Sequence, residues 1–443
     1  MPCVRLRSPC AERRIVRRGA HGEGRAVQDL GREHMIIIGA SHGMLRWFAD
    51  DLPADSVVLI EEPDVIGRRD VDRLAEQMPF ISRLVAAEYQ TGLDADALIA
   101  REPGLAGARL VMPGTEWAVG ATARLADALG LPGAGSAAAD IFTDKHRMRL
   151  LAAEVGLANP AFELVDDPAA ATAFARRHGG RCVLKPTRRS GSLGVQILDD
   201  PQDVAAAWAE TADPADTPEV VDRGLPTAVL VEQVLDGREH SVELLVADGE
   251  VFFGNVTDKR VLLGRRPVES GHTVPTLLPD EARQALLDAA TRLGGAAGFR
   301  TGVLHSEWIM VDGVPTLVEC AARLPGDMIT ALISIAYECG FIEAYLRTLR
   351  GERPTLPTLT TGGAAVEFLV APPGTVSTIE GVRAARRVAG VLNVQFDVTV
   401  GASVGEVTNS LARSGHVMAW GVDPTEATAA AAKAAEQIQI VTG

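Results

Sequence analysis

The sequence predicts a protein of mixed α/β and α+β structure with more than one domain. Its 443 residues are enough for two or three domains, each with a hydrophobic core of its own. Short apolar segments alternate with segments of helical periodicity over residues 35–139, which is typical of a layered α/β unit with parallel strands. Longer strand-like segments follow from residue 227 and meet at Asp-Gly turns, which indicates antiparallel hairpins.

The first predicted domain covers residues 35–140. The segments MIIIGA, SVVLIEE and ARLVMPG are expected to be buried strands, and TEWAVGATARLADALG a helix that stops at Gly130. The turn GASHG after the first strand is similar to the beginning of a dinucleotide-binding loop. It lacks the complete GxGxxG pattern, so we do not expect a cofactor there.

The second predicted domain covers residues 141–360. Its first helix is expected to start at Thr143 or Asp144 and to end near Gly156. Strands FELV, RCVLKP and GVQIL and helices PAAATAFARRHG and PQDVAAAWAE follow, and then a loop, TADPADTPEVVDRGLP. Two long strands meet at Asp248-Gly249, and LPDEARQALLDAATRLGGAAG and MITALISIAYECGFIEAYLRTLRG are each predicted as one helix. Residues 361–443 are predicted as a small α/β lobe that ends in the helix TEATAAAAKAAEQIQI.

Composition excludes several classes of protein. A formal net charge of −15 argues against a nucleic-acid-binding protein with a broad basic face. No apolar segment approaches the roughly 18 residues that a membrane helix needs. The five cysteines form no CxxC pair and suggest no disulfide framework, so a reducing, cytoplasmic location is the simplest interpretation.

The first 34 residues differ from the rest of the chain. They contain eight arginines, no lysine and no hydrophobic period. A transit-like or nucleic-acid-binding arm is one interpretation. We favour a disordered extension upstream of a natural start at Met35, because MIIIGA begins a buried strand at once.

The segment VLKPTRRSGSLGV could bind phosphate. A buried strand ends at Lys185, and a turn with two arginines follows. Backbone N–H groups of a Gly/Ser turn can surround phosphate oxygens, and a lysine at the strand end adds positive charge. An ordinary flexible hairpin turn fits the segment equally well, since the Walker pattern GxxxxGK[ST] is absent from the chain. The candidate residues of this loop are Ser190, Gly191, Ser192 and Gly194.

A second candidate segment is VLVEQVLDGREHSVELL. The edge of a strand at Glu232, Gln233 and Val234 could hydrogen-bond an adenine ring, and the carboxylate of Glu239 could accept hydrogen bonds from ribose hydroxyls. The alternative is a pair of surface acids on either side of a tight turn.

The third candidate segment, LHSEWIMVDGVPTLVECAARLPGD, is a predicted hairpin with glutamates on both strands. A two-residue loop would place Glu307 opposite Val318 and leave Glu319 on the other face, as a partner for Arg323 alone. A three-residue loop would make Glu307 and Glu319 face each other. Two facing carboxylates about 5 Å apart repel unless a cation lies between them, and Mg²⁺ prefers such ligands. In that register His305 and Ala321 share the same face, and Leu304, Trp308, Val318 and Cys320 form the other, mostly apolar face.

These segments occur in an order that resembles the ATP-grasp superfamily of carboxylate–amine ligases. The order is Lys145 at a helix start, Lys185 with its Gly/Ser loop, the Glu232 segment with Glu239, and then Glu307, Glu319 and Arg323. The resemblance runs from about Met35 to the C-terminus. Through VESGHTVP, LHSE and VECAARLPGD the chain is most similar to the L-amino acid ligases, which form dipeptides.

The resemblance implies a fold and a set of roles. It implies an ATP-grasp fold after a small Rossmann-like domain, with residues about 157–230 as a mobile lid and residues 361–443 as a C-terminal lobe. Lys145 and Lys185 would hold ATP phosphates, residues 232–234 the adenine, and Glu239 the ribose. Glu307 and Glu319 would bind magnesium. Glu269 and His272 would lie beside the substrates, either being a candidate base, and Arg323 would hold a carboxylate or an acyl-phosphate.

One position departs from the resembled pattern. The superfamily usually has E-x-N-x-R, whereas this chain has Ala321 in place of the asparagine. We expect water or a phosphate oxygen to fill that coordination position, because magnesium commonly keeps waters. The alternative is a weakened second metal and weaker activity.

The implied reaction is ATP-dependent formation of an amide or peptide bond through an acyl-phosphate. The expected cofactors are ATP and about two Mg²⁺, with Mn²⁺ as a substitute. The expected partners are small carboxylates and amines, with an amino acid among them, and a second copy of the chain in a homodimer. A kinase-like phosphotransferase and a non-catalytic ATP-binding protein are the alternatives.

Overall fold

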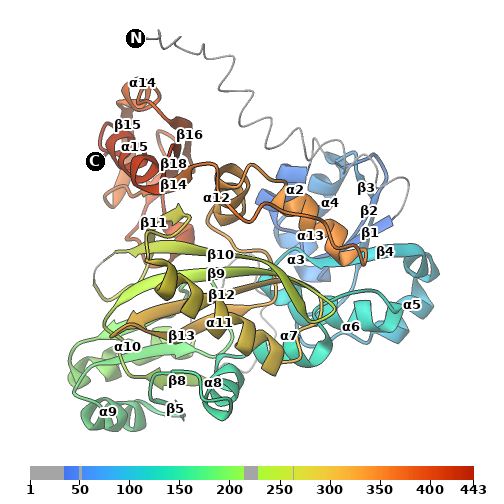
Figure 1. Cartoon of the computed structure of the whole chain (residues 1–443), viewed down its shortest axis with the longest axis horizontal. Helices are drawn as coiled ribbons and strands as arrows, with labels where there is room; N and C mark the ends of the chain where they lie inside the picture. Colours follow the sequence, from blue (N-terminus) through green and yellow to red (C-terminus); the bar gives the residue numbers. More distant parts are fainter. Residues whose placement is uncertain (1–33, 49–51, 214–227, 263) are drawn as a thin grey trace.

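The computed structural model describes residues 34–48, 52–213, 228–262 and 264–443. The predicted N-terminal extension and most of the predicted loop after residue 211 lie outside these ranges. A large antiparallel sheet occupies the middle of the molecule, with the N-terminal unit on one side, a smaller sheet below it, and the C-terminal lobe at the opposite corner (Figure 1).

The N-terminal unit is built on four parallel strands in the order β3-β2-β1-β4. Three of them are the predicted strands, and their apolar residues are buried on both faces, as is typical of parallel sheets. Gly130 ends α6 with a φ of +67°, as predicted. The sequence patterns did not indicate β3 or the short helices around it. The elements are β1 (His34–Ile38), α2 (His42–Phe48), β2 (Val57–Glu61), α3 (Pro63–Arg68), α4 (Val71–Glu76), β3 (Ile81–Ala86), α5 (Ala95–Arg101), β4 (Ala108–Pro113), α6 (Val119–Leu129) and α7 (Ser136–Phe142).

The second sheet, antiparallel in the order β5-β8-β6-β7, forms the region predicted as a lid. The aromatic ring of Phe174 and the side chain of Val204 pack helices α9 and α10 against it. Asp144 is the residue that caps α8, because its carboxylate accepts the N–H groups of His146 and Arg147. The elements are α8 (Lys145–Glu154), β5 (Phe162–Val165), α9 (Pro168–Arg177), β6 (Cys182–Pro186), β7 (Gln196–Leu198), α10 (Val204–Ala212) and β8 (Val229–Glu232).

The central sheet has eight antiparallel strands in the order β13-β12-β9-β10-β11-β14-β18-β16. Helix α11 covers one face, where Leu244, Leu304 and Trp308 form the core. The polar residues of the candidate site project from the other face. The strands and helix are β9 (Arg238–Ala247), β10 (Glu250–Val261), β11 (Glu269–Val274), α11 (Asp280–Ala296), β12 (Gly302–Val311), β13 (Val314–Ala321), β14 (Gly363–Leu369), β16 (Val391–Phe396) and β18 (Gly415–Gly421).

The predicted single helix after residue 327 is wrong. The segment forms two helices, α12 (Ile329–Ala336) and α13 (Phe341–Leu349), with an angle of 107° between them. Glu338 has a φ of +47°, which a continuing right-handed helix cannot contain, and Gly340 precedes the new helix. The break lets both helices bury apolar side chains in a core shared with β1, β2 and β12.

The C-terminal lobe extends the central sheet, because β14 pairs with β11 across the predicted boundary at residue 361. The predicted alanine-rich helix ends at Ala435, and the last residues form a strand. The remaining elements are β15 (Gly374–Glu380), α14 (Val382–Ala385), β17 (Ser403–Val404), α15 (Pro424–Ala435) and β19 (Gln439–Thr442).

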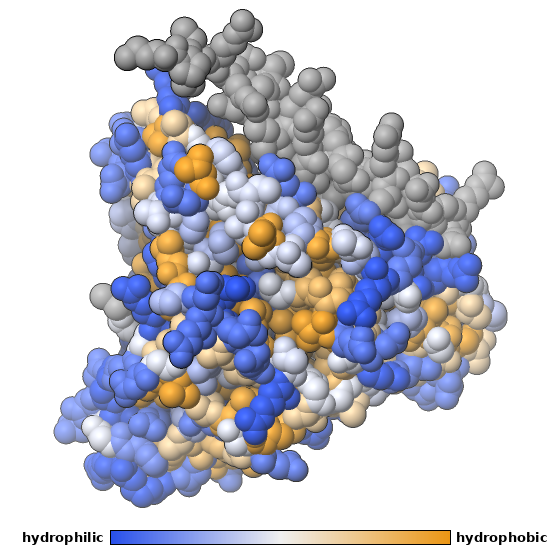
Figure 2. Space-filling model, viewed as in Figure 1, coloured by the Kyte–Doolittle hydropathy of each residue, from blue (hydrophilic) through white to orange (hydrophobic). Residues whose placement is uncertain are grey.

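The surface is uneven in polarity. Hydrophobic side chains gather between α11 and α13, whereas the region of α9 and α10 is mostly hydrophilic (Figure 2). Over the described ranges, no helix taken singly has both the length and the hydropathy to cross a membrane; only the bent pair α12 and α13 meets that test when the two are joined. Within the described ranges, Cys182, Cys320 and Cys339 are buried and take part in no disulfide.

Candidate functional site

The hairpin of β12 and β13 has a two-residue loop. Val311 pairs with Val314, and the loop residues Asp312 and Gly313 have φ values of +50° and +82°. Positive φ at both positions is what a type I′ turn requires, and Asp-Gly is a preferred sequence for it. With regular pairing beyond this loop, the two glutamates would lie on opposite faces.

A β-bulge restores the facing arrangement. Trp308 pairs with Leu317, but the next pair is Glu307 with Glu319, so Val318 is the extra residue on β13. The expectation that the two glutamates face each other is therefore confirmed, although not through the three-residue loop proposed as its cause.

The bulge is held from outside the hairpin. The carbonyl of Val318 accepts a 2.7 Å hydrogen bond from Arg149 Nη2 in α8. The division of faces also agrees with expectation for Leu304, Trp308 and Cys320, which lie in the core beneath α11.

Lys145 connects the hairpin to the predicted phosphate loop. Its Nζ lies 2.9 Å from Glu319 Oε1 and donates a 2.6 Å hydrogen bond to the carbonyl of Arg189. Its backbone N–H donates to the carbonyl of Thr187, so the start of α8 is fixed against the end of β6. The side chain is 7% exposed, which leaves the ammonium group facing the site and not bulk water.

Lys185, Arg149 and Glu232 form a sealed charge cluster, each with a side chain less than 10% exposed. Arg149 donates two hydrogen bonds to the Glu232 carboxylate, at 2.6 and 3.1 Å, and Lys185 Nζ lies 2.6 Å from its Oε2. Burial lowers the pKa of Lys185 to about 8 although Glu232 opposes this. Burial would raise the pKa of Glu232, but Arg149 and Lys185 hold it below its ordinary value.

The carboxylate of Glu232 is occupied by its contacts with Arg149 and Lys185. The adenine role predicted for Glu232, Gln233 and Val234 therefore depends on their backbone groups. The N–H of Gln233 already donates to the carbonyl of Ala161. The role stays a prediction.

The Gly/Ser loop lies between the lid sheet and the rest of the molecule. Gly191, Ser192 and Gly194 have φ values of +65°, +59° and +74°, which lie in the left-handed region that glycine adopts readily. Ser192 Oγ donates to the carbonyl of Pro267, and the N–H of Ser410 donates to the carbonyl of Gly191. The C-terminal lobe thus contacts the loop, whose phosphate role, including that of Ser190, stays a prediction.

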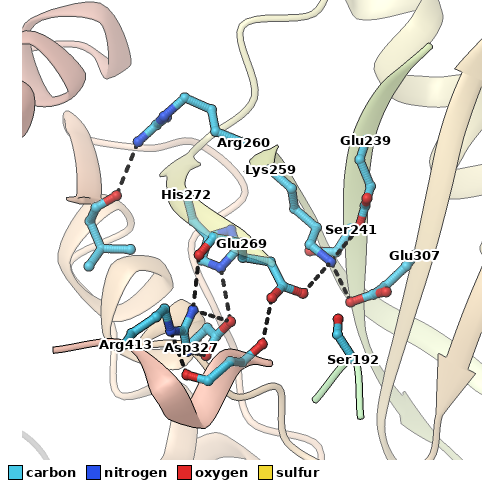
Figure 3. Close-up of polar contacts among 12 residues, drawn as sticks. Ser192, Glu239, Ser241, Lys259, Arg260, Glu269, His272, Glu307, Asp327 and Arg413 are labelled. Atoms are coloured by element: carbon cyan, nitrogen blue, oxygen red, sulfur yellow. Dashed lines mark hydrogen bonds and ion pairs between the residues drawn. The ribbon is translucent and has the colours of Figure 1, made fainter. Parts of the chain in front are cut away.

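Lys259 of β10 lies at the centre of an open charge cluster. Its Nζ is 2.5 Å from Glu239 Oε1, 2.5 Å from Glu307 Oε1 and 3.4 Å from Glu269 Oε1. Figure 3 shows the lysine extending between these three carboxylates, which come from β9, β11 and β12. Sequence reasoning gave Glu239, Glu269 and Glu307 three separate roles, but the fold places them together.

The open cluster has too few cations for its carboxylates. Burial would lower the pKa of Lys259, but Glu239, Glu307 and Glu269 raise it well above its ordinary value. Burial would raise the pKa of Glu307, yet Lys259 and His305 hold it well below. For Glu239, burial and the neighbouring carboxylates outweigh Lys259 and raise the pKa. The cluster therefore favours additional positive charge.

Glu269 and His272 have different surroundings although they lie on one strand, β11. Glu269 accepts a 2.7 Å hydrogen bond from Ser410 Oγ of the C-terminal lobe. His272 is fully buried, and its Nε2 lies 3.4 Å from Asp327 Oδ2. Arg413 of the C-terminal lobe forms a two-point ion pair with Asp327, and its guanidinium stacks 3.7 Å from the centroid of the Phe368 ring. Figure 3 shows Arg413, Asp327 and His272 beside Glu269.

Arg323 lies just past the end of β13 and faces the N-terminal unit. Its Nε donates a 2.5 Å hydrogen bond to Glu116, and its Nη1 donates to the carbonyl of Leu324. An arginine held by a single carboxylate keeps other donors for a second anion. Its predicted role toward a substrate carboxylate stays a prediction.

The donor set fits a hard divalent cation. Glu239, Glu269 and Glu307 each offer a carboxylate oxygen, and these oxygens lie within 4.8 Å of one another. Glu319 faces Glu307 across the hairpin. Mg²⁺ prefers such oxygen ligands, and the excess of carboxylates supplies the charge that it needs.

Among the contributors to the site that the sequence analysis did not name are Arg149, Glu116, Asp327 and Arg413. Asp327 belongs to the LPGD segment that follows Arg323, so its position close to the site could have been predicted from the sequence. Arg413 lies 86 residues from Asp327 and 144 from Glu269, and no local pattern indicates such contacts.

Comparisons with known proteins agree with this fold. Residues 179–331 match the ATP-grasp domain family, and residues 367–443 match the family described as L-amino acid ligase C-terminal domain 2. A solved structure of L-amino acid ligase from Bacillus licheniformis superposes with a TM-score of 0.71 over 93% of this chain and 99% of that one, at 19% identity. The chain therefore contains an ATP-grasp domain, and the predicted fold is confirmed. Its C-terminal domain and its overall fold are both similar to those of L-amino acid ligases.

The matches to curated relatives cover a smaller part of each chain than the structural matches do. Alanine–anticapsin ligase of Bacillus subtilis (strain 168) is 27% identical over 236 residues, which cover 50% of this chain and 49% of that protein. Phosphoribosylamine–glycine ligase of Methanoregula boonei is 32% identical over 274 residues, covering 57% and 61%. A biotin carboxylase domain of Hydrogenobacter thermophilus, solved with MgADP, has a TM-score of 0.63 at 15% identity and covers 92% of this chain and 90% of that one. The match covers 44–63% of the length of the first four curated relatives.

Proposed function

We propose that this protein is an ATP-dependent carboxylate–amine ligase that makes an amide or peptide bond, with an amino acid as one substrate. The observation that carries the proposal is the facing pair Glu307 and Glu319, with Lys145 on one side of it and the Lys259 cluster on the other. This places cation-binding carboxylates beside cations suited to phosphates. The matched ATP-grasp and L-amino acid ligase domains support the same conclusion.

In the first step a substrate carboxylate oxygen attacks the γ-phosphorus of ATP, the bond to the β-γ bridging oxygen breaks, and ADP leaves. Lys145 and Lys185 would neutralise the phosphate oxygens, and Glu307 and Glu319 would hold Mg²⁺, which stabilises the charge that develops during transfer. Arg323 would bind the carboxylate or the resulting acyl-phosphate.

In the second step the amine attacks the acyl carbon, a C–N bond forms, and the C–O bond to phosphate breaks. The amine must lose a proton. We infer that Glu269 accepts it, because its carboxylate lies in the partly open cluster, whereas His272 is sealed from solvent and lies against Asp327. His272 would then position the strand that carries Glu269. The lid, Glu239 at the ribose and the homodimer stay predictions.

Two other functions are compatible with a nucleotide site: phosphate transfer to a hydroxyl, and binding of ATP without catalysis. An assay of ADP and phosphate release with pooled amino acids, ATP and Mg²⁺ distinguishes these three functions. A ligase releases ADP and phosphate only when both a carboxylate and an amine are supplied, and mass spectrometry detects the condensed product. Phosphate found on a substrate hydroxyl would favour a kinase. No ADP release with any mixture would refute the ligase.

Amino-acid pairs are then screened one by one. Alanine is the first acyl donor and the first amine to try, because relatives named alanine–anticapsin ligase align with the chain.

A further inference from the structure

His305 lies beside the predicted metal pair and opposite the residue that departs from the resembled pattern. The hairpin pair next to Glu307–Glu319 is His305–Ala321. Side chains of directly paired residues, and of residues two apart on a strand, project from the same face, so His305 and the two glutamates share the site face. A methyl group at Ala321 offers no ligand atom and occupies little of that space.

The ring of His305 is held by a buried carboxylate. Its Nδ1 lies 3.1 Å from Glu243 Oε1, and Glu243 is 0% exposed. Ser241, Asn255 and Thr257 also donate hydrogen bonds to this carboxylate, at 2.6, 2.8 and 2.8 Å. A carboxylate that accepts the Nδ1 proton fixes the ring, and in the neutral imidazole Nε2 then carries a lone pair, which is the usual arrangement behind a metal-binding histidine.

The other ring nitrogen, Nε2, is directed toward Glu307. Nε2 lies 3.5 Å from Glu307 Oε1, which is at the limit for a hydrogen bond. Neighbouring ligand atoms on one ion, each about 2.1 Å from it and at right angles, are about 3 Å apart. A small movement of either side chain would therefore suffice for both atoms to bind one cation.

A second histidine provides a comparison within the same sheet. His240 is also buried, and its Nδ1 lies 2.9 Å from Asp258. It pairs with Trp308, whose side chain lies in the core beneath α11, so it is on the face away from the glutamates. A carboxylate-bound histidine is thus not by itself a ligand; the shared face with Glu307 and Glu319 distinguishes His305.

We propose that His305 Nε2 is a ligand of the metal ion held by Glu307 and Glu319, in the coordination position that Ala321 leaves without a side-chain ligand. This rests on the proposed function for the existence of the metal site. It replaces the water or phosphate oxygen expected from the sequence alone. A nitrogen ligand shifts preference away from Mg²⁺ and toward transition metals such as Mn²⁺ and Co²⁺.

The test is pulsed EPR of Mn²⁺ bound to the full-length protein in the presence of ADP. The protein is prepared with ordinary histidine and with ¹⁵N-labelled histidine, so that nitrogen from the nucleotide is distinguished from imidazole. We expect a ¹⁴N coupling that becomes a ¹⁵N coupling on labelling. His305→Gln should abolish it and weaken Mn²⁺ binding about tenfold or more. The matched control His240→Gln should change neither.

A double variant tests the position itself. In His305→Gln/Ala321→Asn the amide oxygen returns a ligand across the hairpin, so Mn²⁺ affinity should recover although the histidine coupling stays absent. Bound Mn²⁺ without histidine coupling in the wild-type protein, or unchanged affinity in His305→Gln, would overturn the proposal. If no Mn²⁺ binds, the metal site itself is refuted.

The proposal and the proposed function can fail separately. The EPR signal needs no turnover. Amide formation without histidine coupling would refute only the role of His305, whereas coupling without amide formation from any substrate pair would refute only the ligase.

Discussion

Two groups of charged side chains in the site differ in the sign of their excess charge. The sealed cluster joins two cations, Arg149 and Lys185, to the single carboxylate of Glu232. The open cluster joins one cation, Lys259, to the three carboxylates of Glu239, Glu269 and Glu307. The carboxylates of the open cluster are 13–20% exposed, whereas the Glu232 side chain is 4% exposed.

The difference indicates which ligand each cluster suits. A buried site with more cations than carboxylates can stabilise phosphate oxygens. A site with more carboxylates than cations can bind a metal ion. ATP with a divalent cation carries both kinds of charge, and Lys145 and Glu319 lie in contact with each other beside these clusters. Four experiments test this difference between the clusters.

The largest effect is expected in the sealed cluster. Glu232→Gln leaves two buried cations without a carboxylate and should lower the free energy of unfolding by about 3–5 kcal/mol. Urea denaturation measures it. Glu163→Gln, on the neighbouring strand β5, removes a pair with Arg177 that is about half exposed, and should cost less than about 1 kcal/mol. Equal effects of the two substitutions would contradict the view that Glu232 is structural.

The next effect is on catalysis. Glu319→Gln should lower the rate of ADP release about a hundredfold or more, because a metal contributes several kcal/mol to phosphoryl transfer. Unfolding in urea should change little, since the side chain is 28% exposed. A variant that kept full activity would remove Glu319 from the metal site.

The third prediction concerns pH. Because the pKa of Lys185 is about 8 in the free protein, its positive charge is present at pH 7 and is lost as the pH rises through 8. A bound phosphate favours the charged form, so ADP affinity should fall about tenfold from pH 7 to pH 9. Calorimetry at several pH values measures this. Lys185→Arg keeps its charge and should show a flat profile. An equally steep fall in that variant would place the titrating group elsewhere.

The smallest effect is expected in the open cluster without metal. Glu239→Gln relieves repulsion among three carboxylates that share one lysine, and should leave stability unchanged or raise it by less than about 1 kcal/mol. With Mn²⁺ present, this gain in stability should disappear, because the wild-type protein binds the ion more tightly than the variant does and is stabilised more by it. A loss of stability comparable to that of Glu232→Gln would show that the two clusters do not differ as described.

The sequence by itself determined the order of the elements and most of the local chemistry. Strand and helix periodicity gave β1, β2, β4, α6 and the hairpins, since these depend on neighbouring residues. The Asp312-Gly313 dipeptide determined a turn, and the residue at position 321 was visible as a departure. The facing of Glu307 and Glu319 was one of two registers that the sequence left open, because loop length alone does not reveal a bulge.

The tertiary structure alone decided how these parts meet. The bulge at Val318 depends on Arg149, 169 residues away, and the break between α12 and α13 depends on a core shared with the N-terminal sheet. Lys259 joins carboxylates from three strands, and Arg413 reaches Asp327 from a separate lobe. Such contacts have no period or local spacing in the chain. They arise because buried charges must find partners wherever the fold brings them together.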